Sequence, residues 1–129
     1  SASSNVKFVL ISPIFGEVTS GFDYSTKHFA TDIAVPTNSP VKAVANGTVI
    51  LAEWTIQTGH VIIIEHPYGL TSVYKHNDSG LVSQGDLVKA GQVIALSGNT
   101  GELTTGPHLH FELWRDGSPV NAENYVSFE

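Results

Sequence analysis

The sequence predicts an all-β fold, a compact and mostly antiparallel β-sandwich or barrel-like domain. Short apolar, β-branched runs alternate with turn residues, and these turn signals recur about every 8–12 residues. No window carries the 3.6-residue period of a long helix. A length of 129 residues with 41% hydrophobic residues suits one domain, residues 1–129, with one modest core.

The strands follow one another with little between them. They are expected at Val6–Ile11, Val41–Val44, Thr48–Trp54, His60–His66, Leu70–Lys75, Leu87–Lys89, Val93–Ser97 and His108–Trp114. Asn46–Gly47 is typical of a hairpin turn between the second and third of these strands. The four apolar residues of 61–64 indicate a strand buried on both faces. Only Asn121–Val126 favours a helical turn.

A short internal repeat lies between residues 82 and 92. Val82–Asp86 and Val88–Gln92 both have the form Val-x-x-Gly-polar. The unit is too short for a solenoid repeat. It predicts two successive tight turns that join strands.

Composition excludes several classes of function. The formal charge is −6 with six Lys and Arg, which argues against a nucleic-acid partner. Because there is no cysteine, a disulfide scaffold, a thiolate zinc site and a cysteine nucleophile are ruled out. No apolar run reaches the roughly 20 residues of a membrane span. Residues 1–5 lack a Met and a signal-peptide pattern, and we expect a disordered end of a processed or truncated chain.

His108 and His110 are the most informative pair of polar residues. They are two apart in an expected strand, so alternation places both on one face, with Leu109 and Phe111 on the other. Two imidazoles on one face suit a metal site, or one ligand beside one catalytic base. Two histidines placed there by chance are an equally open interpretation.

His28 and Asp32 provide a second candidate pair. On an extended chain their spacing of four also puts both side chains on one face. Together with a further histidine, they make a three-ligand set with an open fourth position, which is the pattern of catalytic zinc. By itself a His-x-x-x-Asp spacing is a weak signal.

The remaining histidines have simpler explanations. His76 ends the expected strand 70–75 and has the chemistry of a base or acid near neutral pH. His60 and His66 flank the apolar strand, and a structural role is favoured for both. No serine nucleophile elbow and no Gly-rich phosphate loop is present in the sequence.

Three motifs in one order resemble a known family. His28-Phe29-Ala30-Thr31-Asp32 comes first, Tyr74-Lys75-His76 second and Gly106-Pro107-His108-Leu109-His110-Phe111-Glu112 last. This order resembles the lysostaphin-type (LytM-like) metallopeptidases over about residues 12–121. Gly91-Gln92-x-Ile94 and Gly98-Asn99-Thr100-Gly101 resemble the family's approach to the last motif. Two departures are Ala30, where the family usually has Gly, and Asn77, where Leu is typical.

The resemblance implies both a fold and a site. The fold would be a small antiparallel β structure of the duplicated hybrid motif type, with the site in a groove. His28, Asp32 and His110 match the Zn²⁺ ligands, and His76 and His108 match two catalytic histidines beside the metal. Which of those two is the general base stays open. Glu112 shares the face of His110, and we expect it to support that ligand or the structure rather than to take part in catalysis.

The implied function is hydrolysis of peptide bonds in peptidoglycan, in stem-peptide cross-links or in glycine bridges. Such an enzyme would work outside the cytoplasm, in the periplasm, in the cell envelope or as a secreted protein. One alternative is a non-catalytic relative that binds the cell wall or activates another hydrolase. Another is a lipoyl- or biotinyl-type carrier module, which the repeat at 82–92 resembles, but Lys89 does not lie at a hairpin tip.

Overall fold

A computed structural model describes residues 10–101 and 106–129. In these residues, ten strands form one sheet with antiparallel pairing throughout. The strands are β1 (Glu17–Ser20), β2 (Thr31–Ala34), β3 (Pro40–Lys42), β4 (Gly47–Thr55), β5 (Gly59–Glu65), β6 (Leu70–Gly80), β7 (Leu87–Val88), β8 (Val93–Ser97), β9 (His108–Arg115) and β10 (Ser118–Val120). The described residues also contain two 3-10 turns, η2 (Pro67–Gly69) and η3 (Ala122–Asn124). The all-β antiparallel prediction is confirmed.

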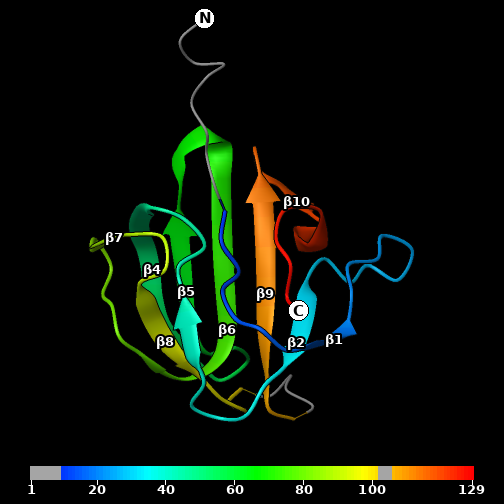
Figure 1. Ribbon diagram of the computed structural model, residues 1–129. Coiled ribbons are helices and arrows are strands. Elements are labelled where there is room, and N and C mark those ends of the chain that lie inside the picture. The colour runs from blue at the N-terminus through cyan, green and yellow to red at the C-terminus, as the bar shows by residue number, and fades with distance from the viewer. Residues whose placement is uncertain (1–9, 102–105) are drawn as a thin grey trace, which may run out of the picture.

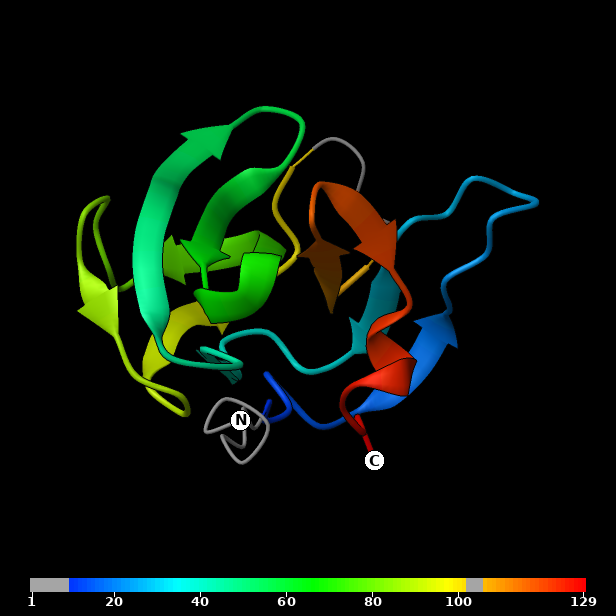
Figure 2. The same cartoon turned by 90° about the horizontal axis from the view of Figure 1, so that it is seen from above.

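The long strand β6 is the centre of the sheet. The main order is β1-β2-β9-β6-β5-β4-β7, with β10 added to β9 and the β3–β8 pair joined to β6 through β8. Figure 1 shows β6 and β9 side by side at the middle, and Figure 2 shows the sheet curling round when seen from above. Along β6, β9 pairs with residues 70–75, β5 with residues 71–77 and β8 with residues 77–80.

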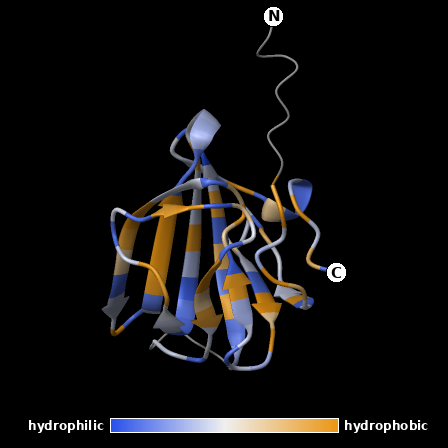
Figure 3. Cartoon of the chain, turned by 60° about the vertical axis from the view of Figure 1, so that its left-hand side comes forward, coloured by the Kyte–Doolittle hydropathy of each residue, from blue (hydrophilic) through white to orange (hydrophobic). Residues whose placement is uncertain are grey.

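The core fills the inner face of this curled sheet. Hydrophobic and hydrophilic stretches are interspersed along the strands (Figure 3), and the buried apolar residues form one core. The inner face of β9 contributes Leu109, Phe111 and Leu113, each no more than 1% exposed. Their neighbours in the core include Ile33, Val41, Val49, Ile62, Ile64, Tyr74 and Ile94. The other face of β9 carries the polar residues His108, His110 and Glu112.

The internal repeat forms the two tight turns that the sequence predicts. Gly85 and Gly91 both have positive φ, at 94° and 86°, a conformation that glycine adopts without steric cost. The polar residue that follows each glycine closes its turn. Asp86 Oδ2 accepts from the backbone N–H of Ser83, and Gln92 Oε1 accepts from that of Lys89.

Several sequence-based expectations were wrong or lie outside the description. Of the strand expected at 6–11, residues 6–9 lie outside the described residues, and 10–11 are not in a strand. Asn46–Gly47 does not join a hairpin, because β3 pairs with β8 and β4 pairs with β5 and β7. Instead, Asn46 Oδ1 accepts from the backbone N–H of Ala90. The end expected for residues 1–5 also lies outside the described residues.

Some strands are longer or more exposed than expected. The strand at 70–75 continues to Gly80, so His76 lies inside β6 and does not end it. Ile63 in β5 is half-buried on the outer face, so that strand is not covered on both sides. The expected turn at 121–126 is confirmed by η3, whose Asn121 side chain caps the backbone N–H of Glu123.

Candidate metal centre

The outer face of β9 carries His108 and His110, and β2 lies beside it. Asp32 of β2 is the cross-strand partner of His110, and Ala34 is the partner of His108. Alternation along both strands therefore brings an aspartate and a histidine to the same face at the same level. The period-two prediction for β9 is confirmed, since Leu109 and Phe111 are buried in the core.

His28 reaches the same place from a loop. It precedes β2 and forms a β-bridge with Asp23, and their backbones exchange hydrogen bonds of 2.8 and 3.0 Å. Lys27, just before it, has a φ of 58°, which turns the chain toward the strand. The stretch from 28 to 32, expected to be extended, has a bend at Ala30 between the bridge residue His28 and the start of β2. Ala30 lies buried between them, at 4% exposure.

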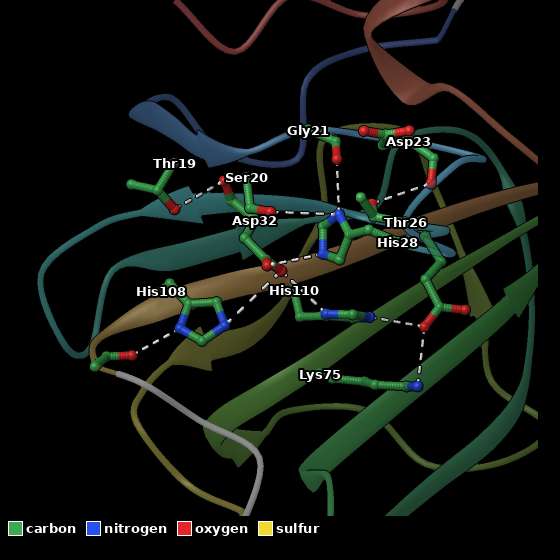
Figure 4. Close-up of polar contacts among 12 residues, drawn as sticks. Thr19, Ser20, Gly21, Asp23, Thr26, His28, Asp32, Lys75, His108 and His110 are labelled. Carbon is green, nitrogen blue, oxygen red and sulfur yellow. Dashed lines mark hydrogen bonds and ion pairs between the residues drawn. The ribbon is translucent and has the colours of Figure 1, made fainter.

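His28, Asp32 and His110 converge with one ligand atom each. These three atoms all lie within 4.8 Å of one another, and Figure 4 shows the side chains pointing toward a common centre. His28 Nε2 lies 3.1 Å from Asp32 Oδ2, and His110 Nδ1 lies 3.0 Å from Asp32 Oδ1. Two imidazoles and a carboxylate are a ligand set of catalytic zinc sites.

One atom shows that this arrangement suits a cation. Asp32 Oδ1 is buried and takes part in no well-aligned hydrogen bond within the described residues, although it is at ion-pair distance from His110. A buried, unsatisfied carboxylate oxygen is costly unless a positive charge compensates it. Burial alone would raise the pKa of Asp32, but its contacts with His110, His108 and His28 lower that pKa below its usual range. The carboxylate is thus held in its ionised form, which is the form that binds a metal ion.

The outer nitrogens of the two histidines are held by oxygen acceptors. His28 Nδ1 lies 2.7 Å from the carbonyl oxygen of Gly21, and His110 Nε2 lies 2.8 Å from Glu112 Oε2. If these outer nitrogens carry the protons, the inner ones present lone pairs to Asp32. This support of a ligand through its second ring nitrogen is typical of metal-binding histidines.

Glu112 is the centre of a second polar group on the same face. Besides His110, it accepts hydrogen bonds from Trp114 Nε1 at 2.9 Å and forms an ion pair with Lys75 Nζ at 2.9 Å. Burial would raise the pKa of Glu112, but its bonds with His110, Lys75 and Trp114 lower it to about 2. The contact of Glu112 with His110 is as expected. Lys75 was not singled out from sequence, although its register opposite His110 places it there.

His76 and His108 stand beside the three convergent residues. The ring centroids of His76 and His108 are 5.1 Å apart, and those of His76 and His110 are 5.7 Å apart. In both, Nδ1 contacts a backbone carbonyl oxygen, of Thr100 at 2.8 Å and of Gly106 at 2.7 Å. Burial lowers the pKa of His76, and the nearby His108 and His110 lower it further against the raising effect of the Thr100 bond. Nε2 is the atom that each can offer to a reactant.

The other two histidines lie away from this centre. His66 is buried and bonds to the Asn46 carbonyl oxygen and to Ser72 Oγ, at 2.8 and 2.7 Å. Its structural role is thus supported by its contacts. His60 pairs with Asn77 on β6 and is half-buried.

Open space adjoins the centre on both sides. A cleft of about 370 Å³ is lined by Thr19, Ser20, Asp32, Ala34, Gly106, Pro107 and His108. A second hollow of about 340 Å³ lies along the outer face and is lined by Ile63, Thr71, Val73, Lys75, Glu112, Trp114 and Gly117. An extended chain crossing the site would have room on either side of Asp32 and His110.

Residues 26–122 match the sequence profile of Peptidase family M23. The chain belongs to this family. It is 41% identical to the peptidoglycan DD-endopeptidase ShyB of Vibrio cholerae, over 84% of this chain and 27% of ShyB. It is 44% identical to the murein hydrolase activator EnvC of Escherichia coli, over 73% of this chain and 22% of EnvC. The chain therefore spans about a quarter of the length of these two relatives.

Solved structures of two peptidases share the fold. The crystal structure of a zinc-containing peptidase from Vibrio cholerae matches with a TM-score of 0.82 and 38% identity, over 90% of this chain and 39% of that one. Lysostaphin from Staphylococcus simulans matches with a TM-score of 0.76 and 30% identity, over 85% of this chain and 48% of that one. The resemblance to lysostaphin-type metallopeptidases is thereby confirmed. In the described residues, no helix is long and apolar enough to cross a bilayer.

Proposed function

We propose that this chain is a zinc-dependent endopeptidase that hydrolyses peptide bonds in peptidoglycan cross-links. The observation that carries the proposal is the convergence of His28, Asp32 and His110 around a buried carboxylate oxygen that the described residues leave unsatisfied. Membership of family M23 and the similarity to a DD-endopeptidase support the reaction class. They also support a location outside the cytoplasm, where peptidoglycan is found.

The proposed ligands are His28, Asp32 and His110, and the cofactor is Zn²⁺. A zinc ion held by three protein ligands keeps a position for water, lowers the pKa of that water to about 7 and polarises a carbonyl. His28 and His110 bind through their inner nitrogens because their outer ones are bonded to Gly21 and Glu112. This part of the site is preorganised before substrate arrives.

His76 and His108 are the proposed proton carriers. Each turns Nδ1 toward a carbonyl oxygen, so Nε2 can accept a proton from the attacking water or deliver one to the leaving amine. One of them would take a proton from water as the water oxygen bonds to the scissile carbonyl carbon, and delivery of a proton to the peptide nitrogen would let the C–N bond break and the amine leave. The other histidine can stabilise negative charge on the carbonyl oxygen or protonate the leaving amine. The division of these roles stays open.

The alternative is a non-catalytic module that binds the cell wall or activates another hydrolase. The similarity to EnvC, whose name is that of an activator, favours this alternative. The complete set of donors at His28, Asp32 and His110 favours the enzyme. A single assay separates them.

That assay is digestion of purified peptidoglycan by the zinc-loaded chain. Two substrates are used, one with D-Ala to diamino-acid cross-links and one with glycine bridges, and the released peptides are identified by mass. We expect cleavage of one bond type, loss of activity with a chelator and no activity for H110A. Zinc bound at full occupancy without cleavage of either substrate would overturn the enzyme and leave the activator.

A further inference from the structure

His76 lies at an irregularity in the pairing of β5 and β6. His60 is the partner of Asn77 and Ile62 is the partner of Tyr74, so Val61 alone faces both Lys75 and His76. This is a β-bulge, with one extra residue on β6. The φ of His76 is 68°, a conformation that residues other than glycine rarely adopt. Such a residue persists only where its surroundings hold it.

The bulge decides where the imidazole of His76 points. Regular alternation would place His76 on the same face as the buried Tyr74, inside the core. The bulge instead brings its ring beside those of His108 and His110. A role for His76 in proton transfer therefore depends on the contacts that stabilise the bulge.

Thr100 contacts the bulge at two points. Its carbonyl oxygen is 2.8 Å from His76 Nδ1, and its hydroxyl donates to the carbonyl oxygen of Asn77 at 2.6 Å. The backbone N–H of His76 donates to Thr58 at 2.8 Å, which ties the bulge to the turn between β4 and β5. The side-chain hydroxyl of Thr100 thus fixes the position of the carbonyl oxygen that orients the ring.

The neighbouring turn approaches Thr100 closely. Gly59 has a φ of 63°, and a Cβ added to it would overlap the hydroxyl of Thr100. Gly101 has a φ of 98°, and a Cβ there would lie 2.7 Å from the carbonyl oxygen of Gln57. The backbone of residues 57–59 is therefore packed directly against the loop that carries Thr100 and Gly101.

We propose that Thr100 is a positioning residue for His76. By holding Nδ1–H through its carbonyl oxygen and the bulge through its hydroxyl, it leaves the Nε2 lone pair of His76 directed at the candidate metal centre. The proposal rests on the proposed function for its catalytic consequence. The tautomer and orientation of His76 are properties of the folded chain and can be measured without any activity.

The first test is ¹⁵N NMR of the histidine rings in the wild-type chain at pH 8, with and without zinc. We expect His76 to be the neutral Nδ1–H tautomer in both states. A predominant Nε2–H tautomer would overturn the proposal. This measurement requires no variant, so it stands even if a substitution at position 100 impairs folding.

The second test compares T100V with T100S. Valine keeps the shape of threonine but lacks the hydroxyl, and serine keeps the hydroxyl. We expect T100V to show a mixture of His76 tautomers and about a 10-fold or larger fall in kcat, with KM and zinc content unchanged. T100S should restore the single tautomer and come within about threefold of wild-type kcat. An unchanged His76 spectrum in T100V, or equal losses in both variants, would overturn the role of the hydroxyl.

The two proposals fail in different ways. If the wild-type chain cleaves peptidoglycan but T100V keeps the wild-type spectrum and kcat, only the role of Thr100 is lost. If neither the wild-type chain nor either variant cleaves peptidoglycan, but T100V alone disturbs the His76 tautomer, then Thr100 does position the ring. In that case only the proposed peptidase function is lost.

Discussion

His110 and Glu112 are bonded to each other along one face of β9, with His110 Nε2 2.8 Å from Glu112 Oε2. Residues two apart on a strand share a face, so the same alternation that exposes the histidine also supplies its acceptor. The carboxylate is in turn fixed by Lys75 and Trp114. The ring of His110 is therefore oriented before any metal binds.

Replacing Glu112 by Gln should weaken zinc binding without abolishing it. The change removes the charge that supports His110, and loss of such a partner typically costs about 10–100-fold in metal affinity. Competition with a chromophoric chelator measures the affinity. E123Q, at an exposed position, is the charge-matched control and should bind as the wild type does. Equal affinity for E112Q and wild type would contradict support through Glu112.

H76A and H108A should each retain zinc but turn over slowly. Neither side chain is a proposed ligand, whereas removing a positioned acid or base costs about 10²–10⁴-fold in rate. Metal analysis and kcat on the same preparations separate the two effects. H60A, at a half-buried histidine outside the cluster, should be close to wild type. Loss of zinc from H108A would mean that it acts as a ligand.

The buried His66 should make stability depend on pH. Burial lowers the pKa of His66 below its ordinary 6.5, against the raising effect of its bond to the Asn46 carbonyl oxygen. The unfolded chain therefore takes up a proton at a higher pH than the folded one does. The stabilising contribution of neutral His66 is complete above pH 6.5 and is lost as the pH falls toward its folded-state pKa.

This pH dependence can be isolated in metal-free protein. Glu65 and Lys89 line the same hollow as His66, and Tyr74 contacts its partner Ser72. All three remain in H66Q, so the difference between wild type and variant reports His66. Urea unfolding at pH 7.5 and pH 5.5 should show a smaller loss of stability in H66Q. An identical loss in both proteins would contradict a buried, neutral His66.

L109A should strongly lower the free energy of unfolding of the chain, although it substitutes none of the proposed site residues. Leu109 is fully buried between the two histidines of β9, and truncating such a leucine costs about 2–5 kcal/mol. The exposed Leu87 is the control, since surface truncations usually change stability by about 0.5 kcal/mol or less. Urea unfolding measures both. A similar small effect for L109A and L87A would place Leu109 outside the core.

The sequence was sufficient to predict those parts of the fold that depend on the local pattern of residues. The division of β9 into a buried face with Leu109 and Phe111 and an outer face with His108 and His110 follows from strand geometry alone. The turns at Gly85 and Gly91 follow from their repeated pattern. The convergence of His28 and Asp32 with the histidines of β9 was predicted only through the family resemblance. The spacing of four between His28 and Asp32 does not specify which distant strand lies beside them.

Other features depend on long-range pairing that no local pattern encodes. The bulge at His76 is defined by its register against β5, so periodicity alone would have sent this residue into the core. Asn46–Gly47 has the composition of a hairpin turn, but β3 forms its ladder with β8. Thr100 lies in a segment that the resemblance includes, but no local pattern indicates its two hydrogen bonds to residues of β6 that are 23 and 24 positions away.

The central claim is a zinc-dependent peptidase in which His110 is a metal ligand. It is tested most directly by measuring zinc content and cleavage of purified peptidoglycan for the wild-type chain and for H110A. The account predicts about one zinc per wild-type chain, held by three protein ligands. It also predicts loss of both zinc and cleavage in H110A. Full zinc occupancy in H110A would contradict the proposed ligand set.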